Sequence, residues 1–286
     1  MLTLYAPAKI NWFIFIPGKR DDGFHEIRSL MQQVDVRDRL TFEPSDSLSL
    51  ESGCGIPTAQ NIVWKAALLL KEHTGTEKGA RMTLVKNIPV EAGLGGGSSD
   101  AAAALVGLDR LWQLGLPREK LLGLAASLGS DVPFFLGPPC ALASGRGEQT
   151  SPVSLDQPLD LVLVKPPFGV PTGWAYRSLS RYSGLTKTED NIKLFIRALK
   201  EGEFARLNGL GGNDLETGVL PAFPEVGRIM ASLRKEGALY VRMSGSGSAV
   251  FGLFPDGQAA RKAAAKMGRW SLCARTVCVC GPENGA

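Results

Sequence analysis

The chain has 286 residues, of which 44% are hydrophobic and 21% charged, a balance typical of a folded protein with a full core and not of a disordered one. The chain has no run of five or more lysines and arginines, which argues against a general nucleic-acid binder. Its formal net charge of +4 is compatible with a small anionic ligand. No apolar segment approaches the ~18 residues that a membrane span needs, so we expect no membrane partner.

The start of the chain and its cysteines favour a cytoplasmic protein. The opening "MLTLYAPAKIN" lacks the basic region, apolar run and cleavage site of a signal peptide. The five cysteines are odd in number and include no C-x-x-C pair, which favours free thiols in a reducing compartment over a metal site.

In the first half of the chain, strands and helices mix. Strands are predicted at 3–16 with a break at Pro7, at 37–44 and 48–53 as an antiparallel pair, at 80–89, and with a turn at 140–149. Helices are predicted at 61–75 with Gly75 as the stop, at 101–114 and at 117–129, a loop at 17–27, and a tight loop or short helix at 129–137.

The second half repeats this mixture from residue 156 onward. Strands are predicted at 159–167, on both sides of a glycine turn in 238–255, and at 274–280; helices are predicted from 171 and at 191–202, 223–237 and 257–270. The polar segment 145–158 predicts a boundary between a domain of residues 1–154 and one of residues 155–286. Because the elements do not alternate regularly, we expect an α+β fold.

The stretch "GLGGGSSD" places glycines and serines directly before the alanine-rich helix predicted at 101–114. The start of a helix attracts anions, and glycines let a phosphate approach the backbone without meeting Cβ atoms. A flexible loop with a serine or aspartate cap fits the pattern equally well. The stretch lacks the lysine of a P-loop, and Ser98 stands where the dinucleotide fingerprint needs its third glycine.

Three motifs in order resemble those of the GHMP kinases: "APAKIN" at 6–11, the loop from Pro89 through Ser99, and "MSGSGSAVFGLF" at 243–254. This resemblance implies a two-domain α+β fold with the active site in the cleft between the domains, ATP as the phosphoryl donor and Mg²⁺. The sequence does not identify the magnesium ligands, for which Ser98 and Ser99 are candidates by position alone. The residues that the resemblance assigns to ATP are Pro89, Val90, Glu91, Ala92, Gly93, Leu94, Gly95, Gly96, Gly97, Ser98 and Ser99.

Within that family, the segments "DGFHEI", "NIVWKAA", "LGSDVPFF" and "NDLE" are most similar to one branch. Its members phosphorylate the 2-hydroxyl of a methylerythritol that carries cytidine diphosphate, in the non-mevalonate route to isoprenoid precursors. The resemblance therefore implies a small-molecule substrate with a cytidine diphosphate. Rival interpretations are a GHMP kinase for a simpler alcohol, a decarboxylase of the same fold, and a binding protein that performs no chemistry.

Two residues of these motifs are candidates for catalysis. Asp131 in "GSDVPFF" reads as a helix cap or turn residue by spacing alone, and Lys9 in "PAKIN" as a surface lysine. The resemblance makes Asp131 the catalytic base and places Lys9 beside it, where an ammonium would keep the carboxylate ionised and orient the hydroxyl. Asn11 lies two residues on, on the same face of the strand, and is assigned to the substrate.

Four further residues are assigned to the substrate. The resemblance implies that Phe24 and His25 in "DGFHE" recognise cytosine, with Phe24 standing where many relatives have tyrosine. Tyr176 is a candidate for a second wall around the base, and Thr172 for either a substrate contact or a helix cap.

Two charged residues flank the glycine-rich stretch. Asp100 is expected to cap the helix or reach Mg²⁺, and Lys86 is expected to face solvent or hold anions.

Overall fold

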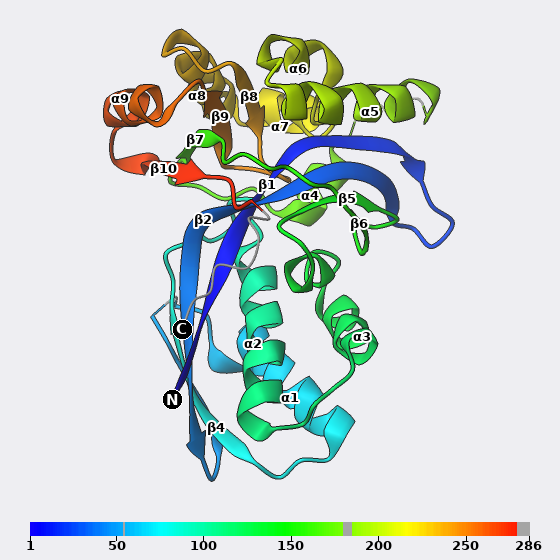
Figure 1. Ribbon diagram of the computed structural model, residues 1–286, viewed down its shortest axis with the longest axis vertical. Helices are drawn as coiled ribbons and strands as arrows, with labels where there is room; N and C mark the ends of the chain where they lie inside the picture. Colours follow the sequence, from blue (N-terminus) through cyan, green and yellow to red (C-terminus); the bar gives the residue numbers. More distant parts are fainter. Residues whose placement is uncertain (54, 180–184, 279–286) are drawn as a thin grey trace. The chain divides into compact units, whose positions relative to one another are not determined.

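The computed structural model describes residues 1–53, 55–179 and 185–278 (Figure 1). They form two compact units, each assembled from several stretches of the chain. Unit 1 consists of Met1–Ala8, Val36–Val90 and Gly95–Gly137; unit 2 consists of Lys9–Asp35, Glu91–Leu94 and the chain from Pro138 onward. The glycine-rich segment is therefore shared, because its first residues belong to unit 2 and its helix to unit 1.

The described strands are β1 (Leu2–Lys19), β2 (His25–Ser45), β3 (Leu48–Ser52), β4 (Gly79–Val85), β5 (Cys140–Ser144), β6 (Gln149–Pro152), β7 (Asp160–Val164), β8 (Tyr240–Met243), β9 (Val250–Phe254) and β10 (Ser271–Arg275). The described α-helices are α1 (Ile62–Thr74), α2 (Gly96–Trp112), α3 (Arg118–Leu128), α4 (Thr172–Arg177), α5 (Leu185–Glu201), α6 (Phe204–Leu210), α7 (Glu216–Ala222), α8 (Pro224–Lys235) and α9 (Gly257–Met267), with short 3₁₀ turns η1 (Thr58–Gln60), η2 (Pro133–Leu136) and η3 (Gly268–Trp270).

Unit 1 packs α1, α2 and α3 on a sheet (Figure 1). Residues 39–45 of β2 pair with β4 in antiparallel fashion, and β3 pairs with β4 in parallel. The predicted antiparallel pair of 37–44 with 48–53 is therefore wrong, because β4 lies between the two strands. Helix α1 keeps the predicted ends: the Asn61 side chain accepts a hydrogen bond from the Val63 amide, and Gly75 adopts the left-handed conformation with φ of 67°.

β1 continues through Pro7, where a break was predicted. Among the described strands β1 pairs only with β2, so it is an edge strand. Proline is tolerated on such a strand because the missing amide need not donate to a second neighbour. The loop predicted at 17–27 is correspondingly short, since β1 ends at Lys19 and β2 begins at His25.

Unit 2 contains a sheet of order β10-β7-β9-β8 in which each neighbouring pair is antiparallel. Helices α8 and α9 cover one of its faces (Figure 1). The apolar run that predicts a buried strand at 159–167 forms β7, whose residues from Leu161 to Val164 are buried. The strand predicted at 274–280 instead forms β10, which ends at Arg275, and Cys280 lies outside the described residues.

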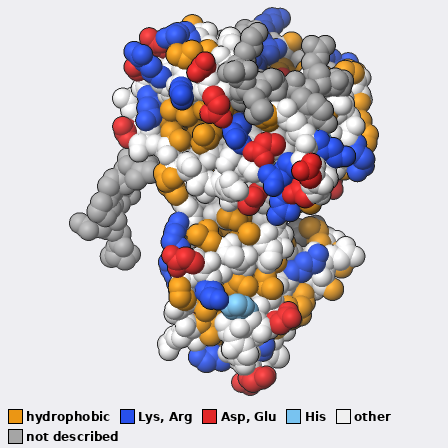
Figure 2. Space-filling view, turned by 90° about the vertical axis from the view of Figure 1, so that its right-hand side faces the viewer, with side chains coloured by type: hydrophobic (Ala, Val, Ile, Leu, Met, Phe, Trp, Pro, Cys, Tyr) orange, Lys and Arg blue, Asp and Glu red, His pale blue; other side chains and the backbone are white. Residues whose placement is uncertain are grey.

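Mixed sheets and helices confirm the α+β class. The linear boundary between residues 154 and 155 stays a prediction, since the compact units interleave along the chain. No helix in the described part of the chain is long and apolar enough to cross a bilayer. On the face shown in Figure 2, lysines and arginines are interspersed with acidic side chains.

Candidate active site

Helix α2 begins at Gly96, five residues earlier than predicted, so Gly96, Gly97 and both serines form its first turn. Its N-cap is Gly95, with φ of 70°, and no side chain in the described residues caps the helix. The leading amides of a helix have no partner within the helix, and here they are left open. A Cβ at Gly97 would meet only Ile62 Cγ2, at 3.8 Å, so the backbone there is bare. This geometry fits a bound phosphate.

Ser99 lies in the same turn and is only 1% exposed. Its amide donates to Gly95 O at 2.9 Å, whereas its Oγ has no hydrogen-bond partner among the described residues. A buried hydroxyl without a partner is costly, so a group that binds there and accepts its hydrogen would recover that free energy. Phosphate oxygens are such acceptors. The sequence also allowed a serine to cap this helix, but no serine side chain caps α2.

Beneath this turn lies a buried charge cluster of Asp38, Lys86 and Asp100. The Lys86 ammonium pairs with Asp38 and, at 2.7 Å, with Asp100 Oδ2. Asp38 is fully buried, and its Oδ1 also accepts the amides of Asn87 at 2.6 Å and Ile88 at 2.8 Å. The carboxylate thereby fixes the backbone that leads into the glycine-rich segment.

Two expectations for this cluster are wrong, namely the helix cap formed by Asp100 and the solvent-facing Lys86. Asp100 lies beyond the first turn of α2 and pairs with Lys86, whose side chain is only 15% exposed. Burial raises the pKa of Asp100 to about 7, against the attraction of Lys86 and with the repulsion of Asp38. Burial alone would lower the pKa of Lys86, but Asp100 and Asp38 together raise it.

Asp131 belongs to unit 1 and lies in the turn that enters η2. The Val132 amide donates to Gly129 O at 3.1 Å, which closes this turn. The N-cap of η2 is Val132, whose side chain forms no capping bond, and Asp131 directly precedes it. Asp131 is half-buried, so part of the residue remains accessible to a small molecule.

In unit 2, Lys9 is only 3% exposed, which excludes the surface lysine considered from the sequence. Its Nζ donates to Asn11 Oδ1 at 2.5 Å and to Gly93 O at 3.1 Å. Asn11 Nδ2 in turn donates to Ser29 Oγ at 2.8 Å, and Ser29 Oγ donates to Phe13 O. Lys9 and Asn11 share a strand face, as predicted. The structure joins this pair to the segment that leads into α2.

The predicted cytosine residues also lie in unit 2. The rings of His25 and Tyr176 are tilted by 31° with centroids 5.2 Å apart. Phe24 is 52% exposed, and the Arg146 guanidinium lies 4.7 Å from its ring centroid. The sequence does not predict this contact, since Arg146 lies far along the chain in the strand and turn predicted at 140–149.

Near these rings, Thr172 forms a hydrogen bond and His25 has a shifted pKa. The Thr172 hydroxyl lies 3.0 Å from Ser246 Oγ, so Thr172 reaches the glycine-rich turn between β8 and β9 and does not cap α4. Burial and the nearby charge of Lys19 lower the pKa of His25. The imidazole is therefore neutral at neutral pH and offers one donor and one acceptor.

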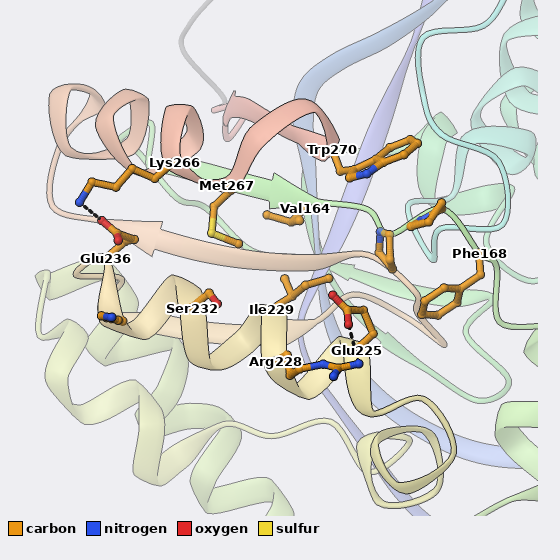
Figure 3. A pocket seen from close by; sticks show the side chains of 13 residues that line it. Val164, Phe168, Glu225, Arg228, Ile229, Ser232, Glu236, Lys266, Met267 and Trp270 are labelled. Atoms are coloured by element: carbon orange, nitrogen blue, oxygen red, sulfur yellow. Dashed lines mark hydrogen bonds and ion pairs between the residues drawn. The ribbon is translucent and has the colours of Figure 1, made fainter.

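A separate pocket of about 820 Å³ lies between α8, α9 and the end of β7 (Figure 3). Two of its cations are paired, Arg228 with Glu225 at 2.7 Å and Lys266 with Glu236 at 2.6 Å. None of the residues assigned from the sequence to ATP, catalysis or substrate lines it. The candidate active site is therefore elsewhere.

Within the described residues, no group of three or more histidine, cysteine, aspartate and glutamate side chains could hold a metal. A nucleotide-bound Mg²⁺ needs few protein ligands, because phosphate oxygens and waters fill most of its octahedron. Ser98 in the first turn of α2 fits that limited demand. Cys140 and Cys273 are free thiols, and Cys54 lies outside the described residues.

Two family models match the chain. The model for the GHMP kinases N terminal domain matches residues 61–137, and the model for the GHMP kinases C terminal matches residues 194–270. The 4-diphosphocytidyl-2-C-methyl-D-erythritol kinase of Thermodesulfovibrio yellowstonii is 44% identical over 92% of this chain and 93% of the relative. That of Pelotomaculum thermopropionicum is 44% identical over 94% of each chain.

The chain belongs to the 4-diphosphocytidyl-2-C-methyl-D-erythritol kinase family of the GHMP kinases.

A solved structure of this family, titled 4-(cytidine 5'-diphospho)-2C-methyl-D-erythritol kinase, is 35% identical and superposes with a TM-score of 0.83 over 96% of this chain and 99% of the other. Homoserine kinase from Cytophaga hutchinsonii is 19% identical with a TM-score of 0.77, covering 97% of this chain and 94% of that one, which shows the shared fold alone. The predicted resemblance to the GHMP kinases, the two-domain fold and the ATP-dependent kinase class are confirmed. The roles of individual residues and the site between the domains stay predictions.

Proposed function

We propose that this chain transfers the γ-phosphoryl group of ATP to the 2-hydroxyl of 4-diphosphocytidyl-2-C-methyl-D-erythritol, giving the 2-phosphate and ADP. The reaction serves the non-mevalonate route to isoprenoid precursors. The relatives named for this activity cover nearly the whole chain, and the uncapped start of α2 supports a phosphate-binding role.

Phosphoryl transfer asks the protein to align donor and acceptor and to offset negative charge. We assign the leading amides of α2 and the hydroxyls of Ser98 and Ser99 to the triphosphate, with the loop from Pro89 to Gly97 shaping the backbone around it. Asp131 accepts the proton of the 2-hydroxyl as its oxygen bonds to the γ-phosphorus and the bond to the β–γ bridging oxygen breaks. Mg²⁺ supplies positive charge to the phosphates when bound.

The observation that carries this proposal is the contact of Lys9 with Gly93. The Lys9 ammonium donates to Gly93 O at 3.1 Å, only three residues before α2 begins at Gly96. A cation is thus tied directly to the segment that leads to the phosphate-binding turn. Asn11 Oδ1 accepts a hydrogen bond from the same ammonium while Asn11 Nδ2 donates to Ser29 Oγ, so the lysine charge and the Asn11 side chain lie together on one strand face.

The cytidine end is assigned to His25, Phe24, Tyr176 and Thr172. A neutral imidazole can donate to or accept from the edge of cytosine, and the exposed ring of Phe24 offers a face for stacking. The tyrosine hydroxyl that many relatives have at residue 24 is not needed for stacking. Tyr176, close to the His25 ring, supplies a second apolar wall.

The direct test mixes the protein with ATP, Mg²⁺ and the cytidylated methylerythritol and locates the new phosphate by phosphorus NMR. We expect a monoester at the 2-position and ADP, with CMP competing against the acceptor alcohol. A product from a simpler alcohol with no inhibition by CMP would reassign the chain within the GHMP kinases. Release of CO₂ would instead indicate the decarboxylase, and ATP binding with no product a non-catalytic protein.

We also propose the cytoplasm as the site of action and a small molecule, not nucleic acid or membrane, as the partner. The free thiols of Cys140 and Cys273 are compatible with a reducing compartment. Binding to DNA that persists at physiological salt would contradict this part of the proposal.

A further inference from the structure

The segment "NDLE", residues 213–216, has no role in the function proposed above, yet it lies in a chain of buried hydrogen bonds. Asn213 is 5% exposed, and its Nδ2 donates to Met243 O at 2.9 Å and to Gly245 O at 2.8 Å. Its Oδ1 accepts the Leu215 amide at 3.0 Å. Glu216 Oε1 accepts the Met243 amide at 2.9 Å. Two side chains of this segment therefore fix the first residues of the glycine turn between β8 and β9.

The glycine turn between β8 and β9 also forms hydrogen bonds to Ala92 and Gly93. Ser244, fully buried, donates from its Oγ to Gly93 O at 3.0 Å, and the Ala249 amide donates to Ala92 O at 3.1 Å. The backbones approach too closely for any side chain: a Cβ at Gly93 would lie 2.0 Å from Ser244 O, and one at Gly245 would lie 2.8 Å from Gly93 O. The position of the Gly93 carbonyl is thus set from one side.

The same carbonyl accepts the Lys9 ammonium at 3.1 Å, and the Lys9 amide donates to Leu94 O at 2.9 Å. The strand that carries Lys9 is also tied to the 212–214 stretch, because the Ile14 amide donates to Gly212 O at 2.8 Å and the Asp214 amide to Ile14 O at 2.9 Å. Residues 212–214 therefore form hydrogen bonds both to the backbone of β1 and to the turn that fixes Gly93 O, the acceptor of the Lys9 ammonium.

A lysine side chain has four rotatable bonds, and fixing them costs conformational entropy. A charge held in place before the substrate arrives avoids that cost during the reaction. We propose that Asn213 and Ser244, acting through the Gly93 carbonyl, are positioning residues that hold the Lys9 ammonium for phosphoryl transfer. This inference rests on the proposed function of Lys9.

The test is a double-mutant cycle on kcat with Ser244→Ala, Lys9→Ala and the pair combined. We expect Ser244→Ala to lower kcat roughly tenfold in the parent and less than about twofold in the Lys9→Ala background, because the lost hydroxyl acts only through the lysine. Ser244→Cys keeps a weak donor and should fall between parent and Ser244→Ala.

The matched control is Ser248→Ala. Ser248 is equally buried in the same turn, but its Oγ donates to Phe168 O and not to Gly93. We expect its melting temperature to fall as much as that of Ser244→Ala, with kcat within about twofold of the parent. A common loss of kcat in both serine variants would identify a general effect of stability.

The outcomes separate the two claims. An unchanged kcat in Lys9→Ala would overturn the role of Lys9 and with it the proposed mechanism. A large loss in Lys9→Ala, together with a Ser244→Ala effect that is absent or equal in both backgrounds, would overturn the positioning role alone.

Discussion

Lys86 and Asp100 form an ion pair of 2.7 Å beneath the first turn of α2, and Asp38 shares the same ammonium. Two buried carboxylates thus face one half-buried cation. The Oδ1 of Asp100 has no hydrogen-bond partner among the described residues. Such an arrangement favours a proton on one carboxylate, in line with the pKa of Asp100 being raised by burial to about 7.

This arrangement predicts how stability depends on pH. The folded protein keeps a proton on Asp100 that the unfolded chain, with an ordinary aspartate pKa of 3.8, releases. The free energy of unfolding should therefore fall as pH rises through the interval from 3.8 to about 7. Asp100→Asn should remove this decline, so that its stability relative to the parent improves by on the order of 1 kcal/mol between pH 5 and pH 8.

Urea unfolding at the two pH values measures the effect. Glu119→Gln, which neutralises an exposed acid in the first turn of α3, is the control and should follow the parent at both. A parallel pH dependence of Asp100→Asn and the parent would show that Asp100 does not take up a proton on folding.

Asp131→Asn should keep ATP binding and lower kcat by on the order of 10²-fold or more, because an amide cannot accept the hydroxyl proton. Titration with ATP followed by calorimetry and a steady-state assay measure the two quantities. Asp46→Asn, an exposed aspartate of unit 1, should leave both unchanged. Turnover at the parent's rate in Asp131→Asn would remove Asp131 from its assigned role.

Two glycine substitutions should separate phosphate binding from folding. Gly97→Ala places a methyl group where only Ile62 Cγ2 lies within 4 Å, so we expect an intact fold and a KM for ATP raised roughly tenfold. Gly93→Ala combines φ of +73° with a Cβ 2.0 Å from Ser244 O, and should lose at least ~2 kcal/mol of stability. Thermal melts and ATP titrations distinguish them. A normal KM in Gly97→Ala would place the phosphates away from this turn.

The affinity for CMP should depend on the protonation of His25. Because burial and Lys19 lower its pKa from the ordinary 6.5, the imidazole is neutral above that pH, and affinity should be constant from pH 8 down to 6.5. Below it, protonation removes the acceptor and should weaken binding up to about tenfold. Calorimetry with His25→Gln should give a flat profile, and with His73→Gln the profile of the parent. An unaltered pH dependence in His25→Gln would assign the titration to another group.

Much of the fold follows from local signals in the sequence. Asn61 and Gly75 bracket α1 because each satisfies backbone groups at a helix end, and the apolar run of β7 forms a buried strand. The glycine turn and the strands beside it also form as predicted. These features depend on neighbours in the sequence, so periodicity and capping preferences are sufficient to find them.

The features that were not predicted from the sequence depend on contacts between residues far apart in the chain. Asp38 lies within an alternating strand that gives no sign of a buried charge, and it meets Lys86 only through the pairing of β2 with β4. The parallel pairing of β3 with β4 cannot be read from either strand alone. The early start of α2 runs against the poor helix propensity of Gly96 and Gly97, so propensity alone places the start of the helix too late.

Because the two units alternate along the chain, this protein cannot be divided into those two units by a single cut. The chain passes from one unit to the other after Ala8, Asp35, Val90, Leu94 and Gly137. A fragment ending at residue 154 would keep β1 yet lose Gly212 and Asp214, which bind it at Ile14, and Val277, whose amide donates to Gln33 O. Engineered splitting or swapping of modules therefore requires several matched junctions, because a single cut would expose strand edges that the intact polypeptide covers.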